Sequence, residues 1–582
     1  MSMVLWHRSP RGYLSREPMT APVTAARVGT TPPAGGAPHE GTPMQHRASV
    51  ATAACLALAL TAACGDSSSS GDADGGSSGA SGAAYAQGGT LTVAIGQDPG
   101  ALDPHQTLLS TVEPVNNAVY DNLAAVGPEG LLPNVASGWD VTPTAVTYTV
   151  RDDVTCSDDS KLSLDVIKRN YDYVLDPANE SPLAGSVPPG TTVTIDEAAS
   201  TLTITSAEPY AYLLETTAPL HLVCEAGLDD RSLLRSGAVG SGPFVLESAK
   251  PDDTYVLTAR EGYAWGPNGA DDSEAEGFPA TVELKVVPDE TTAANLLLSG
   301  DVDAGAFVGP ARDRLTGQDG VREEVVASSL ISLMFNQNAG RPGADPAVRK
   351  ALIASTEAEQ VGGVMLDDKG QPPGGLTVFA SPCQAGGLLE AAIPFEPDEA
   401  AAMLEEAGWT EGSGGIREKD GKELSFTFLY ATSIGGESAG AAMELIASNW
   451  KKAGAEVKIT PMTETAYGEA LFATGAWDAV ILVAGPSNPA DALPLFAGPT
   501  PAEGGQNFAG IQNETFAEKG TQATKTPGEE GCEAWYEGER ALLANGDLHP
   551  LTALTYSVYG KGAEFEVNVE GELMPSSFRV LK

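Results

Sequence analysis

The side chains that most often carry out acid–base or metal chemistry are sparse in this chain. Beyond residue 64 the histidines are His105, His221 and His549, and they lie far apart in the sequence. No pair shows the i and i+4 spacing that places two imidazoles around a zinc ion. The letters Gly75-Gly76-Ser77-Ser78-Gly79 match a hydrolase nucleophile motif, but a Gly/Ser-rich segment predicts neither the strand nor the helix that this motif needs. We therefore expect no catalytic residue, no metal and no cofactor.

Cys64 stands where covalent attachment of lipid is expected. Residues 48–63 form an apolar run that ends in small residues and precedes a polar tract. This run is too short for a comfortable membrane span and suits the core of a secretion signal. The segment Leu60-Thr61-Ala62-Ala63-Cys64 resembles a bacterial lipobox, with Thr61 where leucine is commonest. Two acyl chains, at about 0.8 kcal/mol per buried CH₂, would anchor the chain stably.

The residues around this signal predict how the N-terminal part is organised. Residues 1–43 are rich in Pro, Gly and Ala and would leave the signal far from the N-terminus, so we expect the native start at Met44. We interpret 1–43 as a non-native extension and 44–63 as the signal peptide. Residues 64–87 are rich in Gly, Ser and Asp and predict a flexible tether. The expected product is exported and lipid-anchored on the outer face of the cytoplasmic membrane.

Length, charge and hydrophobic content limit what type of protein the rest of the chain can be. The 582 residues exceed one compact domain and favour two or three packed units. The 78 acidic residues against 33 basic ones give a net charge of −45, which would repel nucleic acid. Hydrophobic residues make up 42% of the chain, enough for ordinary globular cores.

The elements that must position any site alternate between strands and helices. Alternating apolar residues predict strands at 91–95, 146–150 and 282–286. The segments 193–195 and 202–204 flank an acidic turn and predict a hairpin. Helices are predicted from Pro397 to Ala407 and through Met443 and Trp450, each ended by a glycine. This order is an α/β pattern.

Blocks of sequence from about Gly88 to about Tyr559 resemble one family. They include GGTLTVAIGQDPGALDPH (88–105), YTVRDDVTCSDDSKLSLDVI (148–167), GSGPFVLESAKPDDTYVLTAREGY (240–263), LMFNQNAGRPGADPAVRKAL (333–352) and PLTALTYSVYG (550–560). In order and spacing they are similar to the extracytoplasmic solute-binding proteins of ABC importers, family 5, the peptide/nickel/opine type.

The resemblance implies a two-lobed periplasmic-binding-protein-like α/β fold with a hinged cleft. Lobe I is expected at 88–327 plus 549–582, with an extra subdomain inserted at 131–230, and lobe II at 328–548. A small solute would be captured between the lobes and delivered to an ABC permease in the membrane by a monomer that is not an enzyme. Two alternatives stay open: a sensor that presents solute to a membrane receptor, and a surface-anchored hydrolase.

The resemblance also implies ligand contacts from loops that face the cleft. Amide and hydroxyl groups suit an uncharged or mixed ligand because each can donate and accept. The candidates lie in four regions of the sequence. These are the residues after the Asp103-Pro104 turn, those near the first hinge crossing, the segment 482–489 with the tryptophan that precedes it, and the stretch GGQNFAG at 504–510. They are Gln106, Thr107, Glu113, Asn336, Asn338, Trp477, Ser487, Asn488 and Asn507. Each has an alternative interpretation as a turn-former, a cap or a core residue.

One departure from the family concerns the ligand. In peptide binders of this family, a carboxylate before an Asp-Pro pairs with the α-amine of the peptide. Gly485 stands at that place here. We therefore expect simple peptides with a free α-amine to bind poorly.

Four further cysteines are expected to form disulfides in an exported protein, and four cysteines allow three pairings. Cys156 and Cys224 both map to the insertion, and Cys383 and Cys532 both map to lobe II. A bridge between the lobes would restrain the hinge, so the expected pairs are Cys156–Cys224 and Cys383–Cys532. The alternative is four buried, reduced thiols that pack as small apolar groups.

Overall fold

The computed structural model describes residues 85–86, 88–267, 273–377, 383, 388–434 and 436–582. The predicted extension, signal peptide, lipidated Cys64 and almost all of the tether lie outside the described residues. Within the described part of the chain, no helix is both long enough and apolar enough to cross a membrane.

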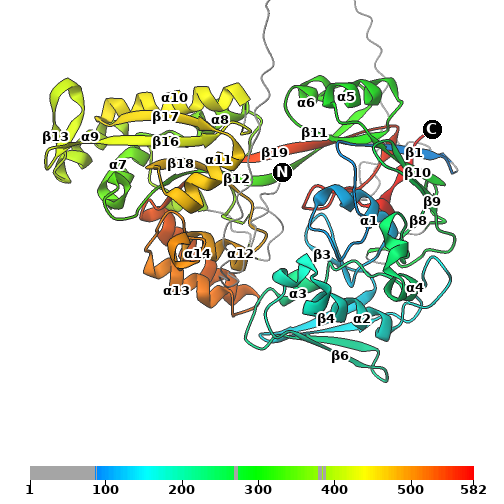
Figure 1. Ribbon diagram of the computed structural model, residues 1–582. Coiled ribbons are helices and arrows are strands. Elements are labelled where there is room, and N and C mark those ends of the chain that lie inside the picture. Colours follow the sequence, from blue (N-terminus) through cyan, green and yellow to red (C-terminus); the bar gives the residue numbers. More distant parts are fainter. Residues whose placement is uncertain (1–84, 87, 268–272, 378–382, 384–387, 435) are drawn as a thin grey trace, which may run out of the picture. The chain divides into compact units, whose positions relative to one another are not determined.

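A ten-stranded mixed sheet organises the fold, in the order β17-β16-β18-β12-β19-β11-β1-β10-β9-β8 (Figure 1). We call the part built on β1 and β8–β11 lobe I, and the part built on β16–β18 lobe II. The strands of lobe I are β1 (Thr90–Ile95), β8 (Phe244–Lys250), β9 (Thr254–Ala259), β10 (Thr281–Val286) and β11 (Ala304–Phe307). Those of lobe II are β16 (Ser425–Ala431), β17 (Glu456–Met462) and β18 (Ala479–Ala484).

Two long antiparallel strands, β12 (Val321–Phe335) and β19 (Leu548–Lys561), join the lobes (Figure 1). Residues 304–307 of β11 pair with 557–560 of β19, whereas residues 330–335 of β12 pair with β18. The ladder between β12 and β19 is irregular between Ala327 and Ser329, which leaves Ser328 outside the regular register. A second irregularity falls between Ile331 and Ser332, and since a bulge bends its strand locally, the ladder is disrupted at two points.

A second sheet with four antiparallel strands is inserted into lobe I, in the order β4-β5-β7-β6. Its strands are β4 (Ala136–Thr142), β5 (Ala145–Val150), β6 (Thr192–Asp196) and β7 (Thr201–Thr205), and its helices are α2 (Leu164–Leu175), α3 (Leu213–Thr217) and α4 (Glu225–Asp229). We call this unit the inserted subdomain. Its own apolar cluster contains Tyr148, Leu202 and Ile204, all fully buried.

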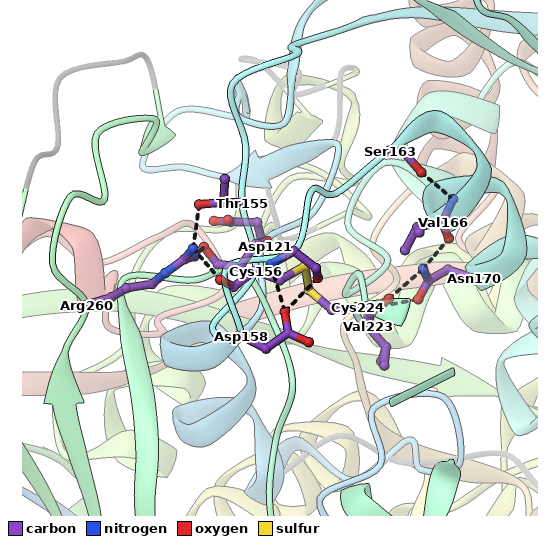
Figure 2. The surroundings of a disulfide bond; sticks show 12 residues. Asp121, Thr155, Cys156, Asp158, Ser163, Val166, Asn170, Val223, Cys224 and Arg260 are labelled. Atoms are coloured by element: carbon purple, nitrogen blue, oxygen red, sulfur yellow. Dashed lines mark hydrogen bonds between the residues drawn. A yellow bond between two sulfur atoms is a disulfide. The ribbon is translucent and has the colours of Figure 1, made fainter. Parts of the chain in front are cut away.

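The Cys156–Cys224 disulfide lies inside the inserted subdomain (Figure 2). The guanidinium of Arg260 donates to the carbonyl oxygen of Cys156 at 2.7 Å and to Oγ1 of Thr155 at 2.8 Å. On the other side, the Asn170 side chain donates to the carbonyl of Val223 at 2.9 Å and accepts from its N–H at 2.7 Å. The second disulfide joins Cys383 to Cys532 on α14 (Glu529–Ala544). Both bonds join the cysteines that were expected to pair.

The core of lobe II is built around the fully buried Trp450 on α10 (Gly436–Ala453). Its ring stacks on Phe335 at 5.5 Å and on Phe428 at 5.4 Å between centroids. The indole N–H donates to the carbonyl of Leu352 at 3.1 Å and to Oγ1 of Thr356 at 3.0 Å. The polar edge of this buried ring is thereby satisfied, as burial requires.

The elements predicted from periodicity are confirmed. The three predicted strands are β1, β5 and β10, the hairpin is β6–β7, and the helices are α9 (Pro397–Glu406) and α10. The predicted α/β class is also confirmed by this arrangement of strands and helices, and the two parts joined by β12 and β19 match the predicted two-lobed fold. The limits of the lobes in the sequence stay a prediction; the limit placed at 327/328 falls at the first irregularity of β12.

Candidate ligand-binding site

The nine residues predicted to contact a ligand lie in three separate places. The first holds Gln106, Thr107 and Glu113 in lobe I, and the second lies at the start of β18. The third lies at the other end of β18, beside the strands that join the lobes. No ligand contact is tested by this placement, so the binding roles stay predictions.

In lobe I, the exposed Gln106 donates its amide N–H to the hydroxyl of Tyr173 at 2.7 Å, and Oγ1 of Thr107 accepts from the N–H of Leu109 at 3.0 Å. Glu113 opens α1 (Glu113–Val119), and its Oε2 lies 2.9 Å from Nε2 of His221. Burial by itself would lower the pKa of His221, but the charge of Glu113 and its hydrogen bond raise it overall. Glu113 therefore stabilises a positively charged imidazole.

The C-terminal segment adds two acidic residues to this place. The amide of Asn117 donates to Oε2 of Glu572 at 2.9 Å, across 455 residues of sequence. Burial raises the pKa of Glu572 well above its usual range, and the charges of Glu113 and Glu570 raise it further. Burial likewise raises the pKa of Glu570. The sequence analysis found only Glu113, because no local pattern connects α1 to residues near the C-terminus.

The second place gathers Asn336, Asn338, Trp477 and Asn507. Asn336 follows the end of β12, where its amide donates to the carbonyl of Trp477 at 2.9 Å and its Oδ1 accepts from the amide of Asn338 at 2.8 Å. Trp477 is fully buried and its indole N–H has no hydrogen-bond partner. The side chain of Asn507 donates to the carbonyl of Ile511 at 2.9 Å and accepts from its N–H at 2.9 Å.

Asn336 and Asn338 were expected near the first hinge crossing, and Asn336 directly follows β12, one of the two strands that join the lobes. Trp477 and Asn336 thus lie at the end of β18 opposite to Gly485. The buried amides of Asn336 and Asn507 satisfy backbone groups of lobe II, as loop-forming amides commonly do.

The third place is the segment at 485–488, which follows β18 and lies beside the irregular part of β12, because Ala484 pairs with Leu330. Ser487 is exposed. Asn488 is 4% exposed and caps α12 (Pro489–Phe496), its Oδ1 accepting from the N–H groups of Ala490 at 2.8 Å and Asp491 at 3.2 Å. Burial raises the pKa of Asp491, which the backbone N–H of Ser487 partly offsets.

A carboxylate that the sequence analysis did not select lies on α3. Oε2 of Glu215 is buried without a hydrogen-bond partner, and burial raises the pKa of Glu215 to about 7. Burial raises the pKa of Tyr210, and the charges of Asp491 and Glu215 raise it further, so this tyrosine lies within electrostatic reach of one carboxylate from each lobe. Sequence carried no signal for this group, since it depends on how the lobes meet.

A recess of about 740 Å³ on lobe II contains none of the predicted residues. It is lined by Glu357, Glu359, Gln360, Gly363, Val364, Asp367, Asp368, Ser438 and Ala441, from the region of α8 (Ala358–Leu366) and α10. Across the described residues, no group of three or more His, Cys, Asp or Glu side chains is arranged to hold a metal ion.

Comparison with known proteins connects this geometry to a family. The chain is 28% identical over 382 residues to Protein XP55 of Streptomyces lividans, covering 64% of this chain and 67% of that protein. It is 30% identical over 261 residues to the oligopeptide-binding protein AppA of Bacillus subtilis, covering 43% of this chain and 45% of AppA.

The fold is shared with solved structures of the same kind. A substrate-binding protein from Microbacterium hydrocarbonoxydans superposes with a TM-score of 0.60 at 25% identity, over 84% of this chain and 99% of that chain. The family model described as bacterial extracellular solute-binding proteins, family 5 Middle, matches residues 130–504. Since this match covers more than half of the sequence, the chain belongs to the family 5 bacterial extracellular solute-binding proteins.

Proposed function

We propose that this protein is an exported lipoprotein that captures a small solute between its two lobes and delivers it to an ABC permease. Membership of the family supports solute binding. The observation that carries the proposal is that the lobes share β12 and β19, whose ladder is irregular at Ser328. Strands with a local irregularity can absorb the change in backbone angles that hinge closure requires, and bound solute then favours the closed population.

The proposed solute is a small organic molecule without the free α-amine of a simple peptide. AppA is named for oligopeptides, whereas the Microbacterium structure is a complex with 4-hydroxybenzoate hydrazide. Gly485 lacks the carboxylate expected to hold an ammonium group. The exposed Ser487 beside it offers a hydroxyl, which both donates and accepts.

A thermal-shift screen of pooled peptides, sugars, opines and chelates tests solute capture. A ligand at 100 times its Kd stabilises the folded protein by about 2.7 kcal/mol, so a true solute raises Tm in a saturable way. Calorimetry with the compound identified should then give one site per chain. A Tm that none of these classes changes would contradict the proposal.

Delivery needs a separate measurement. Uptake of the identified compound, labelled isotopically, should fall strongly in cells that lack this protein and return when it is restored. Unchanged uptake together with proven binding would reject import and leave solute sensing as the function.

Variants at exposed candidates test the position of the site. Gln106→Ala and Ser487→Ala remove exposed side chains, so we expect weaker solute binding with the Tm of the solute-free protein unchanged. Thr194→Ala is the matched control, because it removes an exposed side chain that is not among the candidates and should leave both the affinity and Tm unchanged. Equal affinity in all three variants would place the site elsewhere.

A further inference from the structure

We propose that residues 210–212 of the inserted subdomain form a clasp that fastens this subdomain directly to lobe II. The two parts of the chain are far apart in sequence, and the lobes are also joined by β12, β19 and an ion pair between Lys369 and Asp313 at 2.8 Å. The clasp adds a further connection, and it does not depend on which solute the protein binds.

Two polar contacts define the clasp. The backbone N–H of Ala211 donates to the carbonyl oxygen of Thr524 at 2.8 Å. The hydroxyl of Tyr212 lies 3.7 Å from Sγ of Cys383. Thr524 is the C-terminal cap residue that directly follows α13 (Glu514–Ala523). The carbonyl groups at a helix end have no donor within the helix, and the Ala211 N–H supplies one of them with a donor.

The clasp residues are buried in a different apolar cluster from the rest of the inserted subdomain. Ala211 is 6% and Tyr212 is 3% exposed, and both belong to the apolar cluster of lobe II that contains Trp535 and Phe496. The next residues, Leu213 and Leu214, belong instead to the cluster of the inserted subdomain. The boundary between two cores thus falls between residues 212 and 213, so truncation of Tyr212 removes contacts with lobe II and leaves the core of its own subdomain.

The segment is held firmly on the side of the inserted subdomain. The N–H of Ser206 donates to the carbonyl of Thr144 at 2.9 Å, and the N–H of Tyr210 donates to the carbonyl of Pro143 at 2.8 Å. The hydroxyl of Ser206 also donates to the carbonyl of Glu208 at 2.7 Å. The clasp therefore meets lobe II as an ordered projection of the subdomain.

The receiving surface on lobe II is fixed by the Cys383–Cys532 disulfide. Cys383 is 2% exposed and is the residue that the Tyr212 hydroxyl approaches, while Cys532 lies on α14 in the same apolar cluster. The bond ties Cys383 covalently to α14, so the sulfur atom that Tyr212 approaches is held to a helix of lobe II.

The clasp has a direct consequence for solute exchange. Opening of the cleft must break the Ala211–Thr524 hydrogen bond and expose the apolar surface of Tyr212, in addition to bending β12 and β19. We expect the clasp to raise the population of closed protein without solute and to slow the release of bound solute.

Pulsed electron paramagnetic resonance on the mature protein measures this population. Nitroxide labels at Glu197→Cys on the inserted subdomain and Glu518→Cys on α13 occupy exposed positions on the two sides. The parent should show a short, narrow distance population without solute. Tyr212→Ala should lower the ratio of closed to open protein about tenfold or more, which corresponds to the loss of one buried aromatic contact.

Two further variants keep the test decisive. Ala211→Glu forces an unpaired charge into the contact and should open the lobes in the same way even if Tyr212→Ala fails to fold. Leu233→Ala is the control, because this leucine of lobe I, just beyond the inserted subdomain, is 46% exposed and its truncation should leave the distances unchanged. The proposal is overturned if the parent lacks the short distance, or if folded Tyr212→Ala or Ala211→Glu retains the parent distribution.

Discussion

At the scale of single residues, the same type of side chain can either stabilise the fold or contact a ligand, and its structural surroundings determine which of these roles it has. Asn488 and Asn507 were selected because amides suit a mixed ligand, yet each is buried and binds backbone groups next to it in the chain. Their sequence context alone could not distinguish these roles. Exposed Gln106 and Ser487 keep surfaces that a solute could reach.

Gly485 leads to a prediction about ligand charge. Di- to pentapeptides with a free α-amine should bind weakly, since the ammonium group finds no carboxylate at this position. Gly485→Asp should strengthen their binding about tenfold or more, because a charge-assisted hydrogen bond contributes roughly 1.5–3 kcal/mol. Calorimetry with each peptide and its N-acetylated form measures this. Micromolar binding of peptides by the parent, abolished by acetylation, would contradict the prediction.

Glu215 predicts a pH dependence of stability. Burial raises its pKa from 4.5 to about 7, so the folded protein binds a proton that the unfolded chain has released in this interval. The stability of the parent should therefore fall, through this group, as pH rises from about 4.5 to about 7. Glu215→Gln cannot ionise and therefore does not lose stability in this way. The Tm of the variant minus the Tm of the parent should be larger at about pH 8 than at about pH 5.

The control for this measurement is Glu208→Gln, which changes an exposed carboxylate on the same subdomain. Its Tm difference from the parent should be the same at both pH values. A Glu215→Gln variant that behaves like this control would show that Glu215 ionises normally in the folded protein.

At the scale of elements, the disulfides connect segments that local patterns cannot connect. Cys156 and Cys224 are separated by 68 residues and Cys383 and Cys532 by 149 residues. Each pair stays within one lobe, so neither bond restrains β12 or β19.

Removal of the first bond should destabilise the protein substantially. The chain-entropy relation gives about 4 kcal/mol for a loop of this length. We expect the double variant Cys156→Ala/Cys224→Ala to lose about this much unfolding free energy in urea, while the second disulfide stays intact. Peptide mapping without reductant provides the control, and a peptide linking Cys156 or Cys224 to Cys383 or Cys532 would refute the pairing.

At the scale of the whole molecule, function requires that two lobes move while the chain stays attached to a membrane. The lobes share β12 and β19, and residues 210–212 add a contact that can open. The proposed anchor at Cys64 would leave the lobes free to move at the end of a Gly/Ser/Asp-rich tether.

The anchor predicts a change of location. Cys64→Ala should release the mature protein from membranes into the medium, because the acyl chains are then absent. Fractionation and mass spectrometry of the N-terminal peptide measure this. Cys64→Ala protein that stays with membranes, or parent protein without acyl groups on Cys64, would reject the anchor.

The sequence by itself determined the α/β class, the elements with clear periodicity, the family resemblance and the grouping of the cysteines. These features depend on residue order and on apolar spacing, which are local or can be compared block by block. Only the tertiary structure decided that Glu570 and Glu572 join Glu113 and that Tyr212 packs into lobe II. Each of these depends on contacts between segments hundreds of residues apart, and the burial that sets the pKa of Glu215 exists only after those segments have met.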